Sequence, residues 1–391
     1  MAGMNIRAPF VAPLLAILLS GCVATANAAP HPADSRPVVS AAKSSVERDL
    51  QAVLARHAVP AAAVGLLEAN VLALESYAGT ERPGVPVDKD TRFEIASVTK
   101  TVVAETALRL AEQGLLDLDE PLAGYWIDPD VADDPRLRTL TARHVLTHRT
   151  GFPNWRFFRS DRKLAFESAP GERFGYSGEG FDYLGHAIAE KLGKPFPEVV
   201  NEQLFAPLGI DNAVIENIAL DTHFAKLRDA EGKQFEKHCR PGFCFPESAW
   251  SAAGGLAITL RDYVRVLAAI GSSAGYGPAL AEARDTVVST EGEAQVVSCE
   301  EHPDAQCPLE QGYGLGMQIV RYPDRTLIGH TGGDWSTLSV AYTSPATGQG
   351  VIVFLTGPIG QTALAMVDIL ETIDPRSPYL PLFRSRMEEA G

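Results

Sequence analysis

The chain has 391 residues, of which 46% are hydrophobic and 21% are charged. This composition excludes a disordered chain, a collagen-like chain and a small disulfide-rich scaffold. Lys and Arg total 34 against 49 Asp and Glu, which gives a formal net charge of −15. With this acidic balance and no run of basic residues, nucleic acid is not expected as a partner.

The first residues have the features of an export signal. Arg7 precedes an apolar run over residues 10–19, which is too short to span a membrane and has the length of a signal-peptide core. Residues 19–22 resemble a lipobox, so we expect residues 1–21 to be removed and Cys22 to be lipidated in the cell envelope. The alternative is a cut after Ala28, which would release a soluble protein.

Four further cysteines form two close pairs, Cys239 with Cys244 and Cys299 with Cys307. In an exported chain, disulfides are the default interpretation. Three pairings are possible, and we expect the local one because each bond would close a short loop. The rival is a four-cysteine zinc site, although these spacings lack the paired CxxC pattern of structural zinc.

The chain then divides into segments of different pattern. Residues 22–44 are rich in Ala, Pro and Ser and are expected to form a flexible leader. A folded domain is expected over 45–380. Its first elements are a helix over 46–57, a hairpin over 61–78, and a helix over 97–114 that is apolar nearly all round and therefore buried.

The remaining segments predict the fold class. Residues 115–250 alternate short helical patterns with Pro- and Gly-bearing loops, which indicates a mostly helical subdomain. Closely spaced strands and a final helix then follow, at 313–321, 326–329, 337–343, 351–356 and 364–373. We therefore expect an α/β (α+β) domain: an antiparallel sheet flanked by helices and interrupted by an inserted helical subdomain.

One pair of residues suggests nucleophilic catalysis. Ser97 and Lys100 are three residues apart, so a helix would place both side chains on one face, where the amine can accept the hydroxyl proton. The same spacing recurs at residues 40–43 and 160–163, but neither of those segments opens a buried helix.

Several blocks in fixed order extend this pair: FEIASVTK (93–100), VLTHRTG (145–151), FGYSG (174–178), YLG (183–185), AGGL (253–256), GYGLG (312–316) and GHTGG (329–333). With these blocks the chain resembles the penicillin-recognising serine hydrolases, in the branch of class C β-lactamases, secreted DD-peptidases and related esterases. The resemblance covers about residues 46–373.

The resemblance implies a role for each residue at a motif position. Ser97 would attack a carbonyl carbon and form an acyl-enzyme, while Lys100 and Tyr176 would share the proton transfers, in an order that the sequence leaves open. The backbone N–H groups of Ser97 and Gly333 would form an oxyanion hole. His330 would bind near the Tyr176 hydroxyl or the polar end of the substrate, and the substrate-binding set would be His330, Thr331 and Gly332.

One departure from the family pattern affects the expected substrate. The second motif usually reads Tyr-x-Asn, but here it is Tyr176-Ser177-Gly178, so the amide that contacts the acyl side chain is missing. We expect hydrolysis of small esters, D-amino-acid amides or short peptides in the cell envelope, with no metal and no organic cofactor. The alternatives are a true class C-type β-lactamase, a DD-carboxypeptidase, and a non-hydrolytic β-lactam or cell-wall sensor.

Three weaker motifs compete with this interpretation. Residues 175–179 approach the GxSxG nucleophile elbow around Ser177 but lack its last glycine. His144 and His148 have the spacing of zinc ligands, but without the glutamate of HExxH. Trp155 and Trp335 could line a substrate wall or pack in the core.

Overall fold

The computed structural model describes residues 49–390, except 221, 241–242, 247–248 and 301–305. The expected signal segment, most of the leader, both cleavage sites and Cys22 lie outside the described residues. Within the described part of the chain, every helix is too short or too polar to cross a bilayer.

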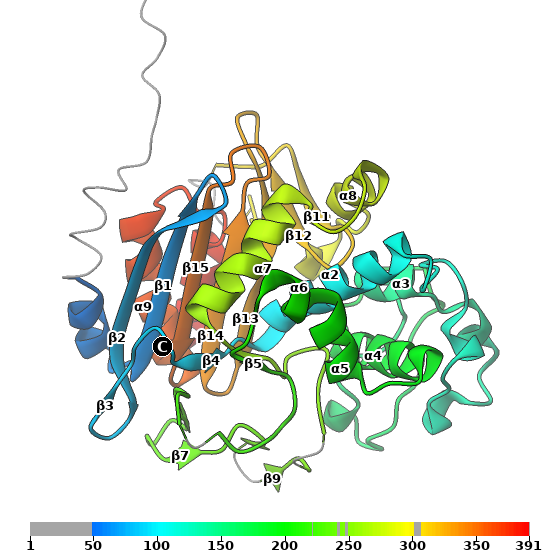
Figure 1. Cartoon of the computed structure of the whole chain (residues 1–391), viewed down its shortest axis with the longest axis horizontal. Helices are drawn as coiled ribbons and strands as arrows, with labels where there is room; N and C mark the ends of the chain where they lie inside the picture. The colour runs from blue at the N-terminus through cyan, green and yellow to red at the C-terminus, as the bar shows by residue number, and fades with distance from the viewer. Residues whose placement is uncertain (1–48, 221, 241–242, 247–248, 301–305, 391) are drawn as a thin grey trace, which may run out of the picture. The chain divides into compact units, whose positions relative to one another are not determined.

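An eight-stranded antiparallel sheet forms the scaffold, in the order β11-β12-β13-β14-β15-β1-β2-β3 (Figure 1). Strands from both ends of the domain meet at its centre, where β1 pairs with β15 from Ala61 opposite Thr356 to Leu67 opposite Gly350. The predicted fold class is confirmed. The strands are β1 (Ala61–Glu68), β2 (Val71–Arg82), β3 (Val85–Pro86), β11 (Glu310–Tyr313), β12 (Gln318–Arg321), β13 (Thr326–Asp334), β14 (Thr337–Thr343) and β15 (Gly350–Thr356).

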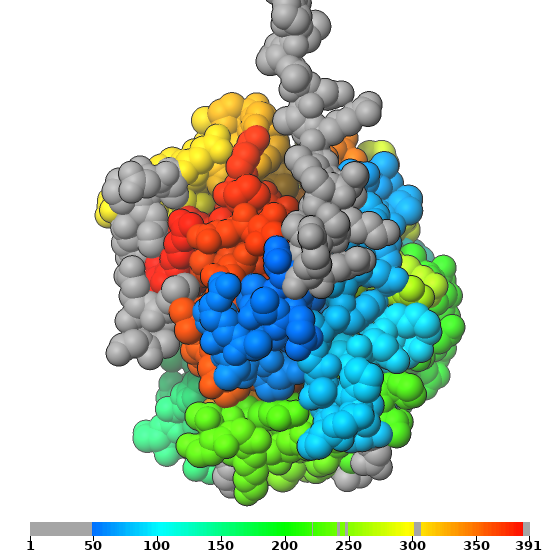
Figure 2. All heavy atoms as spheres, turned by 90° about the vertical axis from the view of Figure 1, so that its left-hand side faces the viewer, coloured from blue at the N-terminus to red at the C-terminus, as the bar shows by residue number. Residues whose placement is uncertain are grey.

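Both faces of the sheet are buried. Alternate residues of β1 point to opposite sides, with Ala61 and Ala63 in one apolar core and Ala62 and Val64 in the other. Helix α7 (Leu260–Ser272) covers the first face and α9 (Ile359–Ile373) the second (Figure 1). The helix over 49–57 lies beside α9 (Figure 2), where Arg56 and His57 both contact Asp368.

The remaining helices lie mainly between the two sets of strands in the sequence. The buried helix expected over 97–114 is present as a short 3-10 turn η1 followed by α2, of which residues 99–110 are all buried. The helices are η1 (Ala96–Val98), α2 (Thr99–Glu112), η2 (Leu122–Gly124), η3 (Pro129–Val131), η4 (Pro135–Thr139), α3 (Ala142–Leu146), η5 (Arg156–Phe158), α4 (Gly178–Leu192), α5 (Phe196–Val200), η6 (Asn201–Phe205), α6 (Ala206–Leu208), α8 (Pro278–Asp285), η7 (Gly292–Ala294) and α10 (Leu380–Ala390).

Three sequence predictions need correction. The strand expected over 313–321 is two strands, β11 and β12, because Gly314 and Gly316 turn the backbone between them. The expected helical subdomain holds α-helices from 142 to 208, but residues 209–250 carry only two-residue strands, which are too short to leave a sequence pattern. These and the small strands beside them are β4 (Arg92–Glu94), β5 (Ala213–Val214), β6 (Leu227–Arg228), β7 (Gln234–Phe235), β8 (Cys239–Arg240), β9 (Phe243–Cys244) and β10 (Ala257–Thr259).

The third correction concerns the domain end. The prediction placed it at residue 380, but α10 continues beyond that point, and its Phe383 is fully buried against the second core. The domain therefore includes at least the first turn of α10.

The four cysteines pair locally, as predicted. Cys239 bonds to Cys244 across the β8–β9 hairpin, and Cys299 bonds to Cys307. Because the two disulfides engage all four sulfur atoms, the four-cysteine zinc interpretation is wrong.

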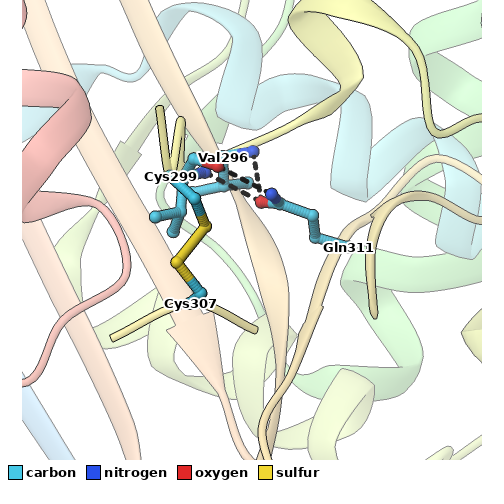
Figure 3. The surroundings of a disulfide bond; sticks show 5 residues. Val296, Cys299, Cys307 and Gln311 are labelled. Carbon is cyan, nitrogen blue, oxygen red and sulfur yellow. Dashed lines mark hydrogen bonds between the residues drawn. A yellow bond between two sulfur atoms is a disulfide. The ribbon is translucent and has the colours of Figure 1, made fainter. Parts of the chain in front are cut away.

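The Gln311 side chain fixes the segment before Cys299 to the sheet. Gln311 of β11 accepts hydrogen bonds from the backbone N–H groups of Val296 and Val297 and donates one to the Val297 carbonyl (Figure 3). The 299–307 disulfide loop therefore begins at a point that is anchored to the sheet edge.

Replacing Gly316 by alanine should destabilise the domain. Gly316 has a φ of +76°, and an added Cβ would lie 2.4 Å from the Cβ of Ala104 on α2. Overpacking costs about 1–3 kcal/mol, and the left-handed backbone adds about 1–2 kcal/mol. Urea unfolding should show a Gly316→Ala loss of about 2–5 kcal/mol.

Gly114 provides the matched control. Its φ is +69°, but nothing lies within 4 Å of an added Cβ. Gly114→Ala should therefore show the backbone cost alone, and equal losses at the two positions would contradict close packing of Gly316 on α2.

Candidate active site

Ser97 and Lys100 are brought together at the start of the buried helix. The Lys100 Nζ donates a hydrogen bond to the Ser97 Oγ at 3.0 Å. Ser97 is half-buried, whereas Lys100 is fully buried. Ser97 is therefore partly open to solvent, whereas Lys100 beside it is not.

The residue before Ser97 is strained. Ala96 has a φ of +45°, in the left-handed region that residues with a Cβ rarely adopt. Strain of this kind is typical of functional sites, where the surrounding structure enforces it. Here the following N–H group approaches β13, since an added Cβ on Gly332 would lie 3.0 Å from the Ser97 N and 2.4 Å from the Ile95 carbonyl oxygen.

The surroundings of Lys100 are polar on one side and aromatic on the other. Its Nζ donates a second hydrogen bond to the Ala253 carbonyl at 2.7 Å. The same atom lies 4.9 Å from the centre of the Tyr176 ring and 5.5 Å from that of Phe181. Among the described residues, no carboxylate pairs with Lys100, so its amine is held by Ser97, a carbonyl and two π-faces.

Tyr176 lies next to Lys100, although it is distant in sequence. The contact that the structure shows is between the Tyr176 ring and the Lys100 Nζ, and Tyr176 is half-buried in the segment just before α4. The ring also stacks on His148, with centroids 4.3 Å apart and planes inclined by 28°. Lys100 therefore lies beside both Ser97 and the Tyr176 ring, and His148 stacks on that ring.

His148 supports Tyr176 from a buried position. Its Nδ1 accepts a hydrogen bond from the Ser177 N–H at 3.1 Å, so its proton is on Nε2. Burial, together with the charge of Lys100, lowers the pKa of His148 well below its ordinary value. The ring is therefore neutral at neutral pH. His148 stacks on the Tyr176 ring and accepts a hydrogen bond from the backbone of Ser177. It therefore fixes both the ring of Tyr176 and the backbone next to it.

His330 is buried in β13 with partners other than the predicted ones. Its Nδ1 donates to the carbonyl of Thr331, and its Nε2 accepts from the Tyr313 hydroxyl at 3.0 Å. Its ring centre lies 6.3 Å from that of Tyr176, and the residue is 1% exposed. The hydrogen bonds of His330 therefore go to Tyr313 and its own strand rather than to the Tyr176 hydroxyl.

The expected oxyanion segment follows His330 along β13. Thr331 and Gly332 are buried, while Gly333 is exposed. In the β13–β14 register, Gly332 faces Ser339, whose hydroxyl donates to the Ile95 carbonyl at 2.7 Å. This hydrogen bond and the close approach of Gly332 to Ser97 hold the strand against the turn that carries Ser97.

Arg240 joins the two backbone segments of the site. Its guanidinium pairs with Glu94, three residues before Ser97, at 2.5 Å, and with Asp334, which follows Gly333, at 2.6 Å. The β8–β9 hairpin that carries Arg240 is closed by the Cys239–Cys244 disulfide.

The rival motifs have structural roles. Ser177 is fully buried and caps α4, with its Oγ accepting from the Gly180 N–H at 3.0 Å and donating to the Pro153 carbonyl at 2.8 Å. The His144 ring bonds to Thr141 as part of a capping box on α3. Ser177 is therefore bound within the fold rather than presented at an exposed elbow.

Sequence reasoning did not assign Ala253, His148, Tyr313 and Arg240 to the site. The first three lie inside the sequence blocks that carry the family resemblance. Their closeness to the site could therefore be predicted from the sequence, but their contacts could not. Arg240 had no local signal, because its partners are 146 and 94 residues away.

A hydroxyl, a buried amine and a phenol grouped at a strained helix start define a site of the serine-hydrolase class. A family model described as Beta-lactamase matches residues 46–368, and the chain belongs to this family.

Among curated relatives, the D-alanyl-D-alanine-carboxypeptidase/endopeptidase AmpH of Escherichia coli (strain K12) is 30% identical over 172 residues, covering 38% of this chain and 43% of AmpH. Esterase EstB of Burkholderia gladioli is 29% identical over 274 residues, covering 58% of this chain and 69% of EstB. The match thus spans less than half the length of AmpH.

Solved structures share the fold. A D-amino acid amidase from Ochrobactrum anthropi SV3, complexed with L-phenylalanine amide, has a TM-score of 0.66 at 20% identity, covering 88% of this chain and 99% of that one. An octameric penicillin-binding protein homologue from Pyrococcus abyssi has a TM-score of 0.65 at 22% identity, covering 88% of this chain and 81% of that one.

Removing the His330 imidazole should change how stability depends on pH. Burial and the charge of Lys100 lower the pKa of His330 to about 3, whereas the pKa of an unfolded histidine is ~6.5. Between these two pKa values the unfolded chain binds a proton at residue 330 that the folded chain does not. This residue therefore lowers the free energy of unfolding by about 2 kcal/mol when the pH falls from 7.5 to 5.

The measurement is urea unfolding of the wild type and His330→Gln at both pH values. The wild-type advantage at pH 7.5 should shrink by about 2 kcal/mol at pH 5. An advantage that stays constant or grows would mean that His330 is not held neutral.

Proposed function

We propose that the protein is a serine hydrolase that forms an acyl-enzyme at Ser97. The observation that carries the proposal is the 3.0 Å hydrogen bond from the fully buried Lys100 amine to the half-exposed Ser97 hydroxyl. An isolated Ser–Lys contact would be weak support. Here it is accompanied by the Tyr176 ring, the approach of β13 and membership of the Beta-lactamase family.

In the proposed reaction, the Ser97 Oγ attacks the carbonyl carbon of an ester or amide. The hydroxyl proton passes to Lys100 or Tyr176 and then to the leaving alcohol or amine as the C–O or C–N bond breaks. Water next attacks the Ser97 ester, returns a proton to the Oγ by the same groups and releases the carboxylic acid. The N–H groups of Ser97 and Gly333 would stabilise the oxyanion, typically by about 3 kcal/mol per donor.

The proposed substrates are small esters and D-amino-acid amides or short peptides. Similarity to an esterase, to a D-alanyl-D-alanine-carboxypeptidase/endopeptidase and to a D-amino acid amidase supports this range. Ester substrates are favoured because residue 178 is glycine and offers no side-chain amide to an acyl group.

We also propose that the protein works in the cell envelope, attached through a lipidated Cys22. The two disulfides support an oxidising compartment. Whether the chain is lipidated or cut after residue 28 changes its attachment and not its chemistry.

Two serines separate this proposal from the elbow interpretation. Ser97→Ala should abolish labelling by a fluorophosphonate and ester hydrolysis while retaining the fold, because the removed hydroxyl is the nucleophile. Ser177→Ala should still be labelled but should lose about 0.5–2 kcal/mol of stability with the α4 cap. Intact-protein mass spectrometry and thermal unfolding report the two effects; labelling that survives in Ser97→Ala and disappears in Ser177→Ala would reverse the assignment.

Tyr176→Phe isolates the phenol hydroxyl. The ring that stacks on His148 is retained, so the melting temperature should change little. The kcat on a 4-nitrophenyl ester should fall about 10²–10⁴-fold if the hydroxyl transfers a proton. A variant with wild-type kcat across pH 6–9 would remove Tyr176 from the chemistry and leave the proton transfers to Lys100.

A further inference from the structure

Residue 178 is a glycine, and the indole of Trp155 fills the space that a side chain at this position would occupy. An added Cβ on Gly178 would lie 2.4 Å from the Cζ2 atom of Trp155, 2.5 Å from its Cη2 and 2.8 Å from its Cε2. No side chain can enter at position 178 while the indole is there. Gly178 is therefore required by Trp155.

The indole is held firmly in this position. The carbonyl of Asn154 accepts hydrogen bonds from the N–H groups of Gly178 and Glu179, at 3.1 and 3.0 Å, and its Oδ1 accepts another from Gly178 at 3.0 Å. The loop that carries Trp155 thus caps the first turn of α4. On its other side, the indole stacks on Phe157, with ring centres 5.4 Å apart.

The next residue locks the loop through charge. The Arg156 guanidinium pairs with Glu179 at 2.8 Å, with Asp128 at 2.6 Å and with Asp130 at 3.1 Å, and its backbone N–H donates to Glu179 at 2.8 Å. The side chains of Asp128 and Glu179 are nearly buried, so their hydrogen bonds with Arg156 are charge-assisted and largely shielded from water. Trp155 therefore lies between two anchored neighbours.

Position 178 lies close to the reacting groups. Tyr176, two residues earlier, and Phe181, three residues later, both place their rings on the Lys100 amine. Trp155 is only half-buried, and its stacking partner Phe157 is 37% exposed. An aromatic surface thus begins where the Tyr-x-Asn pattern would present an amide.

From this arrangement we propose that Trp155 determines acyl-group specificity, an inference that rests on the proposed function. The subsite takes an aromatic or aliphatic acyl side group by contact with the indole, and it disfavours acyl groups that carry an amide. A buried substrate amide would find no partner at position 178 and would lose its hydrogen bonds to water. Among the substrates proposed above, the subsite therefore favours esters of apolar carboxylic acids over short peptides.

The first part of the test examines the packing. Gly178→Asn should lower the melting temperature strongly, whereas Gly175→Asn is the matched control, because nothing lies within 4 Å of an added Cβ at position 175. Adding Trp155→Ala to Gly178→Asn should restore most of the loss, so that the two changes are not additive. Equal stability of the two asparagine variants would overturn the claim that the indole fills this space.

The second part measures specificity with two 4-nitrophenyl esters that share a leaving group, the phenylacetate and the N-acetylglycinate. The wild type should favour phenylacetate in kcat/KM, and Trp155→Ala should lower that preference about tenfold. The Trp155→Ala/Gly178→Asn double variant should shift the ratio of the two kcat/KM values further toward the N-acetylglycinate.

The outcomes distinguish the two proposals. An active enzyme whose preference is unchanged in Trp155→Ala would overturn the specificity assignment alone. A wild type that hydrolyses neither ester and whose Ser97 resists a fluorophosphonate would overturn the hydrolase function, and the substrate assignment with it. Trp155→Ala keeps the test decisive even if Gly178→Asn does not fold.

Discussion

The site depends on the burial of the Lys100 amine, which is shielded from water and has few polar partners. Lys100 is buried on a helix that is itself enclosed, and its amine contacts one hydroxyl and one carbonyl oxygen. None of the described carboxylates forms an ion pair with this amine, so its burial is costly, and the Tyr176 and Phe181 rings reduce that cost. The same arrangement directs the amine at the Ser97 hydroxyl, which is the contact on which the proposed proton transfer depends.

Segments from distant parts of the chain hold this arrangement. The turn that carries Ser97 follows β4, the carbonyl of Ala253 precedes β10, and the proposed oxyanion segment belongs to β13. Arg240 links the first and last of these through Glu94 and Asp334, and the neutral ring of His148 holds the phenol. His148 and His330 are both buried near Lys100, and their lowered pKa values keep them neutral. They therefore add no positive charge beside the Lys100 amine.

The sequence predicts those features that repeat or stand in fixed order. The central hairpin follows from two apolar runs around a turn, and Ala69 and Asn70 adopt the positive φ angles that such a turn needs. The Ser97–Lys100 pair follows from helical spacing. The strand break at Gly314–Gly316 and the small strands after residue 209 could not be read in the same way, because each depends on packing with distant segments.

The site shows the same division. Motif order predicts that Ser97, Lys100 and Tyr176 meet, but it says nothing about His148 stacking or the Tyr313 bond to His330, which are set by side-chain directions. The absence of an amide at Gly178 is visible in the sequence, while its cause, the indole of Trp155, lies 23 positions earlier and is evident only in three dimensions.

A crystal structure of the protein after reaction with a fluorophosphonate would show which residue is modified and where the oxyanion binds. We expect phosphorus bonded to the Ser97 Oγ, the phosphonyl oxygen within hydrogen-bond reach of the Ser97 and Gly333 N–H groups, and the Lys100 amine still next to the Oγ. An adduct on another residue, or a phosphonyl oxygen turned away from β13 with Lys100 withdrawn, would contradict it.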